Sequence, residues 1–239
     1  ILFGWLSDRI GRKPIVLAGC ALAALTYFPA FEALTSAANP ALAEAQARAP
    51  VTVHADPATC SLQFDPVGRK TFDSTGCDIA KSTLAKAGVP YANAPAGSGE
   101  VTIGAERIEV GDMTDYGARL TAALGKAGYP AKADPERIDT VKVIAILSYL
   151  VLLVTMVYGP IAALLVELFP SRIRYTSMSL PYHIGNGWFG GFLPTTAFAM
   201  VAATGDIYYG LWYPIVIAAA TVVVGLLLLP ETFTRDIDS

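Results

Sequence analysis

Four apolar stretches constrain the fold of this chain more than any other feature. Residues 14–31 and 143–166 contain no charged side chain, and two further apolar stretches cover residues 176–203 and 209–229. An α-helix of about 18 residues reaches roughly 27 Å, close to the ~30 Å hydrocarbon core of a bilayer. With 54% hydrophobic and 15% charged residues, the chain is also too apolar for an ordinary soluble domain. The sequence therefore predicts four transmembrane helices.

The segment 50–139 differs in composition from the rest of the chain. It holds twelve of the 20 acidic and nine of the 17 basic residues. Strands are expected at residues 51–54, 61–64, 101–103 and 107–110, the last two as a hairpin, and helices at 41–49, 77–87 and 114–127. The similar stretches 84–90 and 124–130 indicate either a duplicated hairpin-and-helix unit or two common helix ends.

These patterns predict an all-α transmembrane bundle of four spans with a small extramembrane α+β insert. Residues 1–49 would hold a charged turn and the first transmembrane helix, and residues 50–139 the insert. Residues 140–239 would then form three transmembrane helices and a cytoplasmic tail.

Cations at the ends of the apolar stretches predict the orientation. Short loops rich in Lys and Arg remain in the cytoplasm. The cations expected on that side are Arg9, Arg12, Lys13, Arg172, Arg174 and Arg235. The short turn at residues 204–208, on the other side, contains Asp206 and no cation. We therefore expect a multi-pass protein of the inner (plasma) membrane, with residues 50–139 facing the periplasm or exterior.

Cysteine positions give an independent prediction of sidedness. Cys60 and Cys77 lie in the insert, and Cys20 lies in the first apolar stretch. In an oxidising compartment Cys60 and Cys77 would form a disulfide that stabilises the fold by on the order of 3 kcal/mol. Two free thiols would be expected if the insert faced the reducing cytosol.

Enzymatic and nucleic-acid-binding functions have little support in the sequence. The two histidines, His54 and His183, are in different regions, and no HExxH or CxxC motif could hold a metal. Residues 68–71 lack the Gly directly before Lys that a phosphate-binding loop needs, and no G-x-S-x-G motif occurs. A net charge of −3 does not suggest nucleic acid. We expect no enzyme activity, no metal and no cofactor.

The turn ahead of the first apolar stretch carries a specific pattern. Residues 4–13 read G-x-x-x-D-R-x-G-R-K, with Gly4, Asp8, Arg9, Gly11, Arg12 and Lys13 at the defined positions. This pattern resembles the signature loop of the major facilitator superfamily, in the version found between the eighth and ninth helices.

Further segments resemble the metabolite/proton symporter family of that superfamily. These are residues 166–176, 179–185 and 189–191, similar to the region of the tenth and eleventh helices, and the ending Pro230-Glu231-Thr232. The resemblance implies helices nine to twelve of a twelve-helix transporter for small organic solutes such as carboxylates, betaines or amino acids. It also implies an N-terminal half outside this chain, in agreement with Ile1-Leu2-Phe3, which reads as the end of a helix. The insert departs from the family, whose corresponding loop is usually short.

The two predicted cytoplasmic loops carry charges of both signs. Asp8 can pair with an arginine, and Arg9 or Arg12 can pair with Glu167 at the end of the second span. Such pairs would act as a latch on one state of a transporter, with Arg172 and Arg174 in the facing turn. The alternative is a solvated loop without a latch.

The third apolar stretch carries polar side chains at membrane depth: Tyr182, His183, Asn186 and Trp188. Polar groups there are costly unless they face a partner or a cavity, so we expect them to line the path of the substrate. For His183 the alternative is a hydrogen-bonded histidine in helix packing.

Taken together, the residues and the resemblance predict secondary active transport of a small organic solute, coupled to protons, by alternating access. The partners would be the lipid bilayer, the solute and protons. The alternative is a membrane-anchored binding or sensing protein that acts through its insert.

Overall fold

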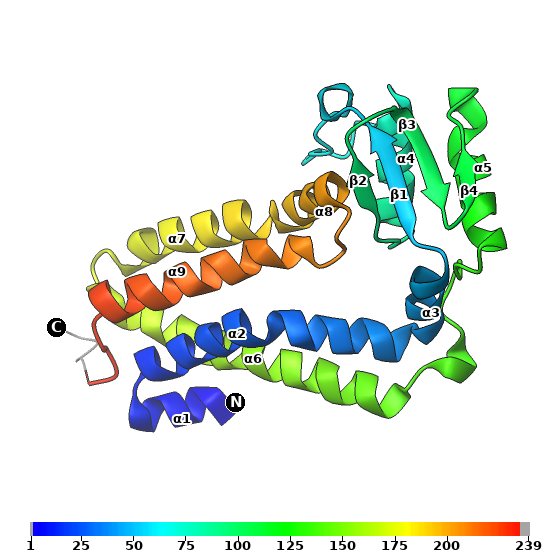
Figure 1. Ribbon diagram of the computed structural model, residues 1–239. Helices are drawn as coiled ribbons and strands as arrows, with labels where there is room; N and C mark the ends of the chain where they lie inside the picture. Colours follow the sequence, from blue (N-terminus) through cyan, green and yellow to red (C-terminus); the bar gives the residue numbers. More distant parts are fainter. Residues whose placement is uncertain (1, 235–239) are drawn as a thin grey trace. The chain divides into compact units, whose positions relative to one another are not determined.

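The computed structural model describes residues 2–234 and is mostly helical (Figure 1). Within this described range, three helical segments are long and apolar enough to cross a membrane: α2 (Arg12–Ala38), α6 (Thr140–Leu168) and Tyr209–Leu228, which contains η4 (Tyr209–Leu211) and α9 (Trp212–Leu228). They match the first, second and fourth predicted spans. Arg235, predicted to be cytoplasmic, lies outside the described residues.

The region of the third predicted span is interrupted. It consists of α7 (Arg174–His183), a π-helical segment η3 (Ile184–Gly190) and α8 (Leu193–Thr204). Four glycines lie between residues 185 and 191, and each weakens a regular α-helix. The predicted third span, residues 176–203, is thus present as consecutive helical segments rather than one regular α-helix, and a membrane crossing by the whole region stays a prediction.

The N-terminal charged stretch is also more regular than expected. Residues Leu2–Ile10 form helix α1, so the predicted turn over residues 4–13 is reduced to Gly11. Gly11 has φ +103°, a conformation that glycine adopts far more easily than any other residue. The glycine thus separates α1 from α2 within a single residue.

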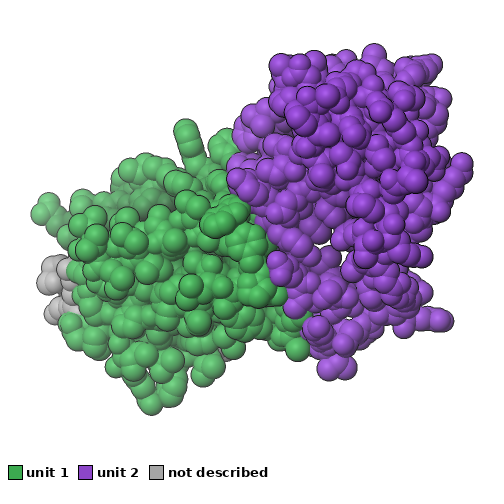
Figure 2. Space-filling view, viewed as in Figure 1, with its two compact units in different colours: residues 1–30, 144–193, 211–239 green, residues 31–143, 194–210 purple. Residues whose placement is uncertain are grey.

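The chain divides into two compact units, which Figure 2 shows in different colours. Unit 1 comprises residues 1–30, 144–193 and 211–239, and unit 2 comprises residues 31–143 and 194–210. Unit 2 contains more of the chain than the predicted insert of residues 50–139, because it also includes the end of α2, helix α3 (Pro40–Arg48) and most of α8.

Helix α2 approaches both α6 and α9 closely in unit 1. A Cβ added at Gly19 would lie 3.0 Å from Met156 and Val157, and one added at Gly225 would lie 2.5 Å from Leu17. Small residues permit such close helix contacts in membranes. The Oγ1 of Thr26 and the hydroxyl of Tyr149 share a hydrogen bond of 2.8 Å between α2 and α6.

Unit 2 contains a four-stranded sheet in the order β2-β1-β3-β4. Strand β1 (Val51–Ala55) pairs in parallel with β2 (Ala92–Ala94) and antiparallel with β3 (Ser98–Ile103), which pairs antiparallel with β4 (Glu106–Ile108). Helices α4 (Gly76–Lys86) and α5 (Met113–Lys126) pack side by side against the sheet. The short helices η1 (Pro57–Thr59) and η2 (Pro135–Arg137) lie in the connections.

The sheet and its helices lie between the end of α2 and the start of α6, and we call residues 39–139 the sheet domain. Its core follows from alternating side chains. Along β1 residues 51, 53 and 55 are buried while 52 and 54 are partly exposed, as expected for a strand with one face on the core. Val53 and Val101 meet the buried side chains of Leu84, Tyr116 and Leu120 from the two helices.

The two ends of the sheet domain lie close together. The N–H of Asp139, just before α6, donates to the carbonyl of Ala37 at the end of α2, at 3.0 Å. Arg137 and Glu44 form an ion pair of 2.5 Å beside this contact.

Most of the expected elements between residues 41 and 127 are present, with three corrections. Residues 61–64 form no strand, and the short strand β2 was not expected. Since no hairpin precedes α4, the duplicated hairpin-and-helix unit is wrong. The similarity lies in the helix ends, where Gly88 and Gly128 both have positive φ. The amides of Val89 and Tyr129 donate to Leu84 and Leu124, each at 3.0 Å.

The structure places Cys60 and Cys77 in a disulfide, with a sequence separation of 17, and leaves Cys20 as a buried free thiol.

Replacing both paired cysteines by serine should lower the stability of the protein by about 3 kcal/mol, because the unfolded chain regains the entropy of the closed loop. Thermal unfolding of the purified protein measures this loss. A Cys20→Ala variant is the control, and an equal loss in the control would contradict the expectation.

Candidate functional site

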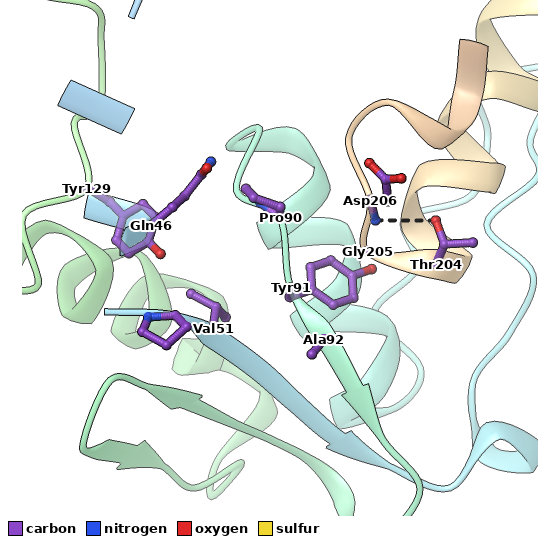
Figure 3. Close-up of a pocket in the computed structure, with 10 residues that line it drawn as sticks. Gln46, Val51, Pro90, Tyr91, Ala92, Tyr129, Thr204, Gly205 and Asp206 are labelled. Carbon is purple, nitrogen blue, oxygen red and sulfur yellow. Dashed lines mark hydrogen bonds between the residues drawn. The ribbon is translucent and has the colours of Figure 1, made fainter. Parts of the chain in front are cut away.

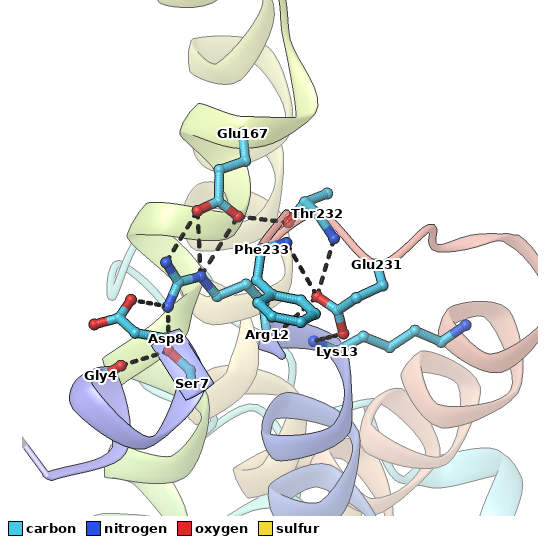
Figure 4. A network of polar contacts seen from close by, with 9 residues as sticks. All are labelled: Gly4, Ser7, Asp8, Arg12, Lys13, Glu167, Glu231, Thr232 and Phe233. Carbon is cyan, nitrogen blue, oxygen red and sulfur yellow. Dashed lines mark hydrogen bonds and ion pairs between the residues drawn. The ribbon is translucent and has the colours of Figure 1, made fainter. Parts of the chain in front are cut away.

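A cluster of polar side chains joins three separate segments of unit 1 (Figure 4). The segments are the junction of α1 and α2, the C-terminal end of α6, and the residues that follow α9. Arg12 lies at the centre of this group, which we call the Arg12 cluster: Ser7, Asp8, Arg12, Lys13, Glu167, Glu231 and Thr232.

The guanidinium of Arg12 binds two carboxylates and a hydroxyl. Its Nη2 lies 3.0 Å from Oε1 of Glu167, and its Nε donates to the same carboxylate at 3.3 Å. Its Nη1 donates to Oγ of Ser7 at 2.6 Å and forms an ion pair with Asp8. Arg12 is 8% exposed. A buried charge is tolerated when it is paired and hydrogen-bonded, as it is here.

Glu167 links the arginine to the segment after α9. Its Oε2 accepts a hydrogen bond of 2.6 Å from Oγ1 of Thr232, which is completely buried. The end of α6 therefore contacts both the start of α2 and the C-terminal segment through one carboxylate.

Glu231 caps the start of α2. Its carboxylate accepts hydrogen bonds from the backbone N–H groups of Arg12 at 2.9 Å and Lys13 at 3.2 Å. These amides have no partner within the helix, and a negative charge at a helix N-terminus is stabilised by the helix dipole. The Nζ of Lys13 donates to the carbonyls of Leu226 and Leu229 at the end of α9, at 3.1 and 2.8 Å.

The capping of α2 makes the stability of the protein depend on pH. Burial by itself raises the pKa of Glu231, but hydrogen bonds from four backbone N–H groups outweigh it and hold the pKa below its ordinary value. Because the pKa of Glu231 is lower in the folded than in the unfolded state, its ionised carboxylate stabilises the fold above about pH 5. This stabilisation is lost as the pH falls through the folded-state pKa.

We therefore expect the unfolding temperature of the wild type to fall more steeply between about pH 5 and pH 3 than that of a Glu231→Gln variant. Thermal unfolding across this range measures the difference. Glu136→Gln, at an exposed glutamate in η2, is the control and should keep the wild-type slope. Equal slopes in all three proteins would contradict the role of Glu231.

The other residues expected in the cytoplasmic loops are not members of the Arg12 cluster. Gly4 accepts a hydrogen bond from Ser7, at 2.7 Å, and Arg9 stacks on the ring of Trp5, at 4.0 Å. Arg174 donates to the carbonyl of Phe169 at 3.1 Å. Arg172 is exposed, and within residues 2–234 no hydrogen bond or ion pair joins it to the Arg12 cluster.

The sequence interpretation missed three members of the cluster: Ser7, Glu231 and Thr232. Glu231 and Thr232 belong to the Pro-Glu-Thr ending that carries the family resemblance, which was the available signal for them. Ser7 lies inside the signature pattern at an undefined position, so nothing in the sequence marked it.

Unit 1 also contains a cavity of about 870 Å³ between α2, α6, α9 and the α7–η3 region. Tyr182 and Asn186 line it, together with Gly185 and Phe189 and many aliphatic side chains. The side-chain amide of Asn186 donates to the carbonyl of Tyr182 at 3.0 Å. Of the four residues expected along the substrate path, Tyr182 and Asn186 thus line this cavity, whereas His183 and Trp188 do not.

His183 and Trp188 make ring contacts instead. The ring of His183 lies 5.9 Å from that of Tyr182, and the ring of Trp188 lies 6.3 Å from that of Phe192. No group of three His, Cys, Asp or Glu side chains that could hold a metal ion occurs in the described part of the chain.

Comparison with known proteins agrees with a membrane transporter. The family model for "Sugar (and other) transporter" matches residues 118–239, about half of the chain. A "Putative metabolite transport protein" of Haemophilus influenzae is 30% identical over 120 residues, which cover 50% of this chain and 26% of that protein. The chain therefore spans about a quarter of the length of this relative. No solved structure matches the chain.

The family match includes α6, α7, α8 and α9, and therefore the Glu167 and Thr232 side of the Arg12 cluster. The match and the long apolar helices identify a membrane protein, and no catalytic family is indicated. This chain belongs to the sugar (and other) transporter family, within the major facilitator superfamily.

Proposed function

We propose that the protein carries a small organic solute, of the carboxylate, betaine or amino acid type, across the inner membrane by alternating access, driven by a proton gradient. Membership of the transporter family and the name of the relative from Haemophilus influenzae support transport of a small solute. The protein would act together with an N-terminal half outside this chain.

The observation that carries the proposal is the burial of Arg12 between Asp8 and Glu167. The side chains of Arg12 and Glu167 are only 10% and 8% exposed, and they join α2 to α6. Separating such a pair leaves two uncompensated charges, so the pair favours the state in which it is closed. The Arg12 cluster would thus act as the inner gate. Its ion pairs would be formed while the cytoplasmic side is closed and would break when that side opens.

The cavity lined by Tyr182 and Asn186 is the proposed part of the substrate path. Its volume of about 870 Å³ falls in the range that ligand sites occupy. Its walls are mostly apolar with few polar groups, as in sites that orient a small solute. The π-helical segment beside it places Gly185 and Asn186 at its edge, and such segments occur often at functional sites.

We propose that residues 50–139 face the periplasm or exterior. The cations near α1, α2 and α7 support this orientation, and so does the disulfide between Cys60 and Cys77, since disulfides persist in oxidising compartments. After mild reduction, an impermeant thiol reagent should label Cys60, which is partly exposed, in intact cells. An introduced Asp8→Cys should be labelled only after the membrane is permeabilised. Reversed labelling would overturn the orientation.

Uptake by the complete protein tests the transport function. Radiolabelled carboxylates, betaines and amino acids are offered to cells with and without a proton ionophore. We expect uptake of at least one class, lost on adding the ionophore. No uptake of any class would overturn the proposal, and uptake insensitive to the ionophore would overturn proton coupling.

Charge reversal tests the gate in the same assay. Arg12→Glu and Glu167→Arg should each lower uptake at least about tenfold, a factor that corresponds to about 1.4 kcal/mol. The double variant should recover part of the loss, since residue 12 would still face Asp8. Arg172→Glu, outside the cluster, is the matched control and should leave uptake near the wild-type rate. No recovery in the double variant would contradict the gate.

A further inference from the structure

The C-terminal end of α8 is covered by side chains of the sheet domain, and both lie in unit 2. The last carbonyls of any α-helix lack partners inside the helix. Here the hydroxyl of Tyr91 donates to the carbonyl of Ala202 at 2.5 Å. The side-chain amide of Asn93 donates to the carbonyl of Thr204 at 2.8 Å, and Nζ of Lys81 lies 3.5 Å from the carbonyl of Ala203.

The backbone of the sheet domain extends the same contact. The N–H of Tyr91, just before β2, donates to the carbonyl of Gly205 at 3.0 Å. Gly205 has φ +83°, and a Cβ added there would lie 2.0 Å from the carbonyl oxygen of Tyr91. The turn after α8 therefore packs directly on the chain that leads into β2.

Burial strengthens this contact. Tyr91 is 7% exposed and Ala202 is 1% exposed. Burial also raises the pKa of Tyr91, so its hydroxyl keeps its proton and remains a donor. A buried helix end with satisfied carbonyls is costly to separate, because each carbonyl would then need a new partner.

We propose that Lys81, Tyr91 and Asn93 form a C-terminal cap for α8, so that the sheet domain and the end of α8 move as one body during transport. The capping is independent of the function proposed above, whereas the joint movement rests on it. The surface of the sheet domain that carries Lys81, Tyr91 and Asn93 thus binds a helix end of the same chain.

A neighbouring tyrosine supplies a matched control. A cavity of about 390 Å³ lies between the two tyrosines. Tyr91 is on one side of it, beside Pro90 and Ala92, and Tyr129 is on the other, beside Gln46 (Figure 3). Tyr129 is buried like Tyr91, and its hydroxyl also donates to a backbone carbonyl, that of Ala49, at 2.7 Å. This hydrogen bond lies within the sheet domain and does not reach α8.

Hydrogen exchange followed by mass spectrometry tests the cap in the full-length protein. Tyr91→Phe should accelerate exchange of the amides in residues 202–208 by roughly five- to tenfold, the factor that one lost hydrogen bond implies. Tyr129→Phe should leave that segment unchanged and accelerate exchange near Ala49. Unchanged exchange in residues 202–208 of Tyr91→Phe, or equal acceleration in both variants, would overturn the cap.

Cross-linking tests the joint movement. Lys81→Cys and Ala203→Cys, combined in a Cys20→Ala background, are joined with a short thiol cross-linker, and the single variants treated in the same way are controls. Uptake at the rate of the untreated protein is expected, because the two parts need not separate. Loss of uptake only in the cross-linked double variant would overturn joint movement. Absence of uptake in every protein, including the wild type, would instead refute the transport function and leave the exchange result to decide the cap.

Discussion

Replacing Glu167 by alanine is expected to destabilise the protein by about 3 kcal/mol, at the lower end of the range for a broken buried ion pair. The variant leaves the guanidinium of Arg12 buried with only Asp8 and Ser7 as partners, and it removes the acceptor of the buried hydroxyl of Thr232. Thermal unfolding in detergent, with membrane abundance measured in parallel, should show a large fall in the unfolding temperature.

An exposed ion pair in the sheet domain provides the control for Glu167. Arg107 and Glu109 lie 3.2 Å apart with side chains that are 54% and 68% exposed. Glu109→Ala should change stability by less than about 1 kcal/mol, because solvent already screens this pair. Similar losses in the two variants would show that the burial of the Arg12 cluster carries no special stability.

Replacing Gly205 by alanine should have a comparable effect through a different mechanism. The left-handed backbone costs a residue with a Cβ about 1–2 kcal/mol, and forcing the methyl group against a packed neighbour costs about 1–3 kcal/mol more. The neighbour is the backbone carbonyl of Tyr91, which cannot rotate away as a side chain could. Thermal unfolding should therefore show a loss of about 2–5 kcal/mol.

Gly88 separates the two contributions. It follows α4 as Gly205 follows α8, and it has φ +65°, but no atom lies within 4 Å of the position of an added Cβ. Gly88→Ala should therefore lose only the backbone contribution of about 1–2 kcal/mol. If Gly88→Ala proved as destabilising as Gly205→Ala, the close contact with Tyr91 would be of no consequence.

The sequence predicted the elements whose signals are local. Long apolar stretches gave α2, α6 and α9, and the glycines at 88 and 128 gave the ends of α4 and α5. The family resemblance likewise rested on local patterns at residues 4–13 and 166–191, and the family match agrees with it.

The π-helical segment in the third apolar stretch was not predicted, because hydropathy does not distinguish such a segment from an α-helix. Its glycines were visible, but the same residues also serve close helix packing. A Cβ added at Gly187 would have no atom within 4 Å, so this glycine makes room for no neighbouring helix.

The candidate site was foreseen only in part for a similar reason. Opposite charges at positions 12 and 167 suggested a pair, whereas Glu231 bonds mainly to backbone amides, whose positions appear only when the helix ends are placed. The cap on α8 could not be predicted either, because Tyr91 and Ala202 are 111 residues apart and meet through tertiary packing.

The contact between Asp139 and Ala37 has a consequence for how such a protein can change over evolution. Because the sheet domain begins and ends at nearly one point, its removal or replacement need not alter the spacing of the helices it interrupts. The position between α2 and α6 is thus one at which a folded domain can be exchanged without changing the distance between the two helix ends.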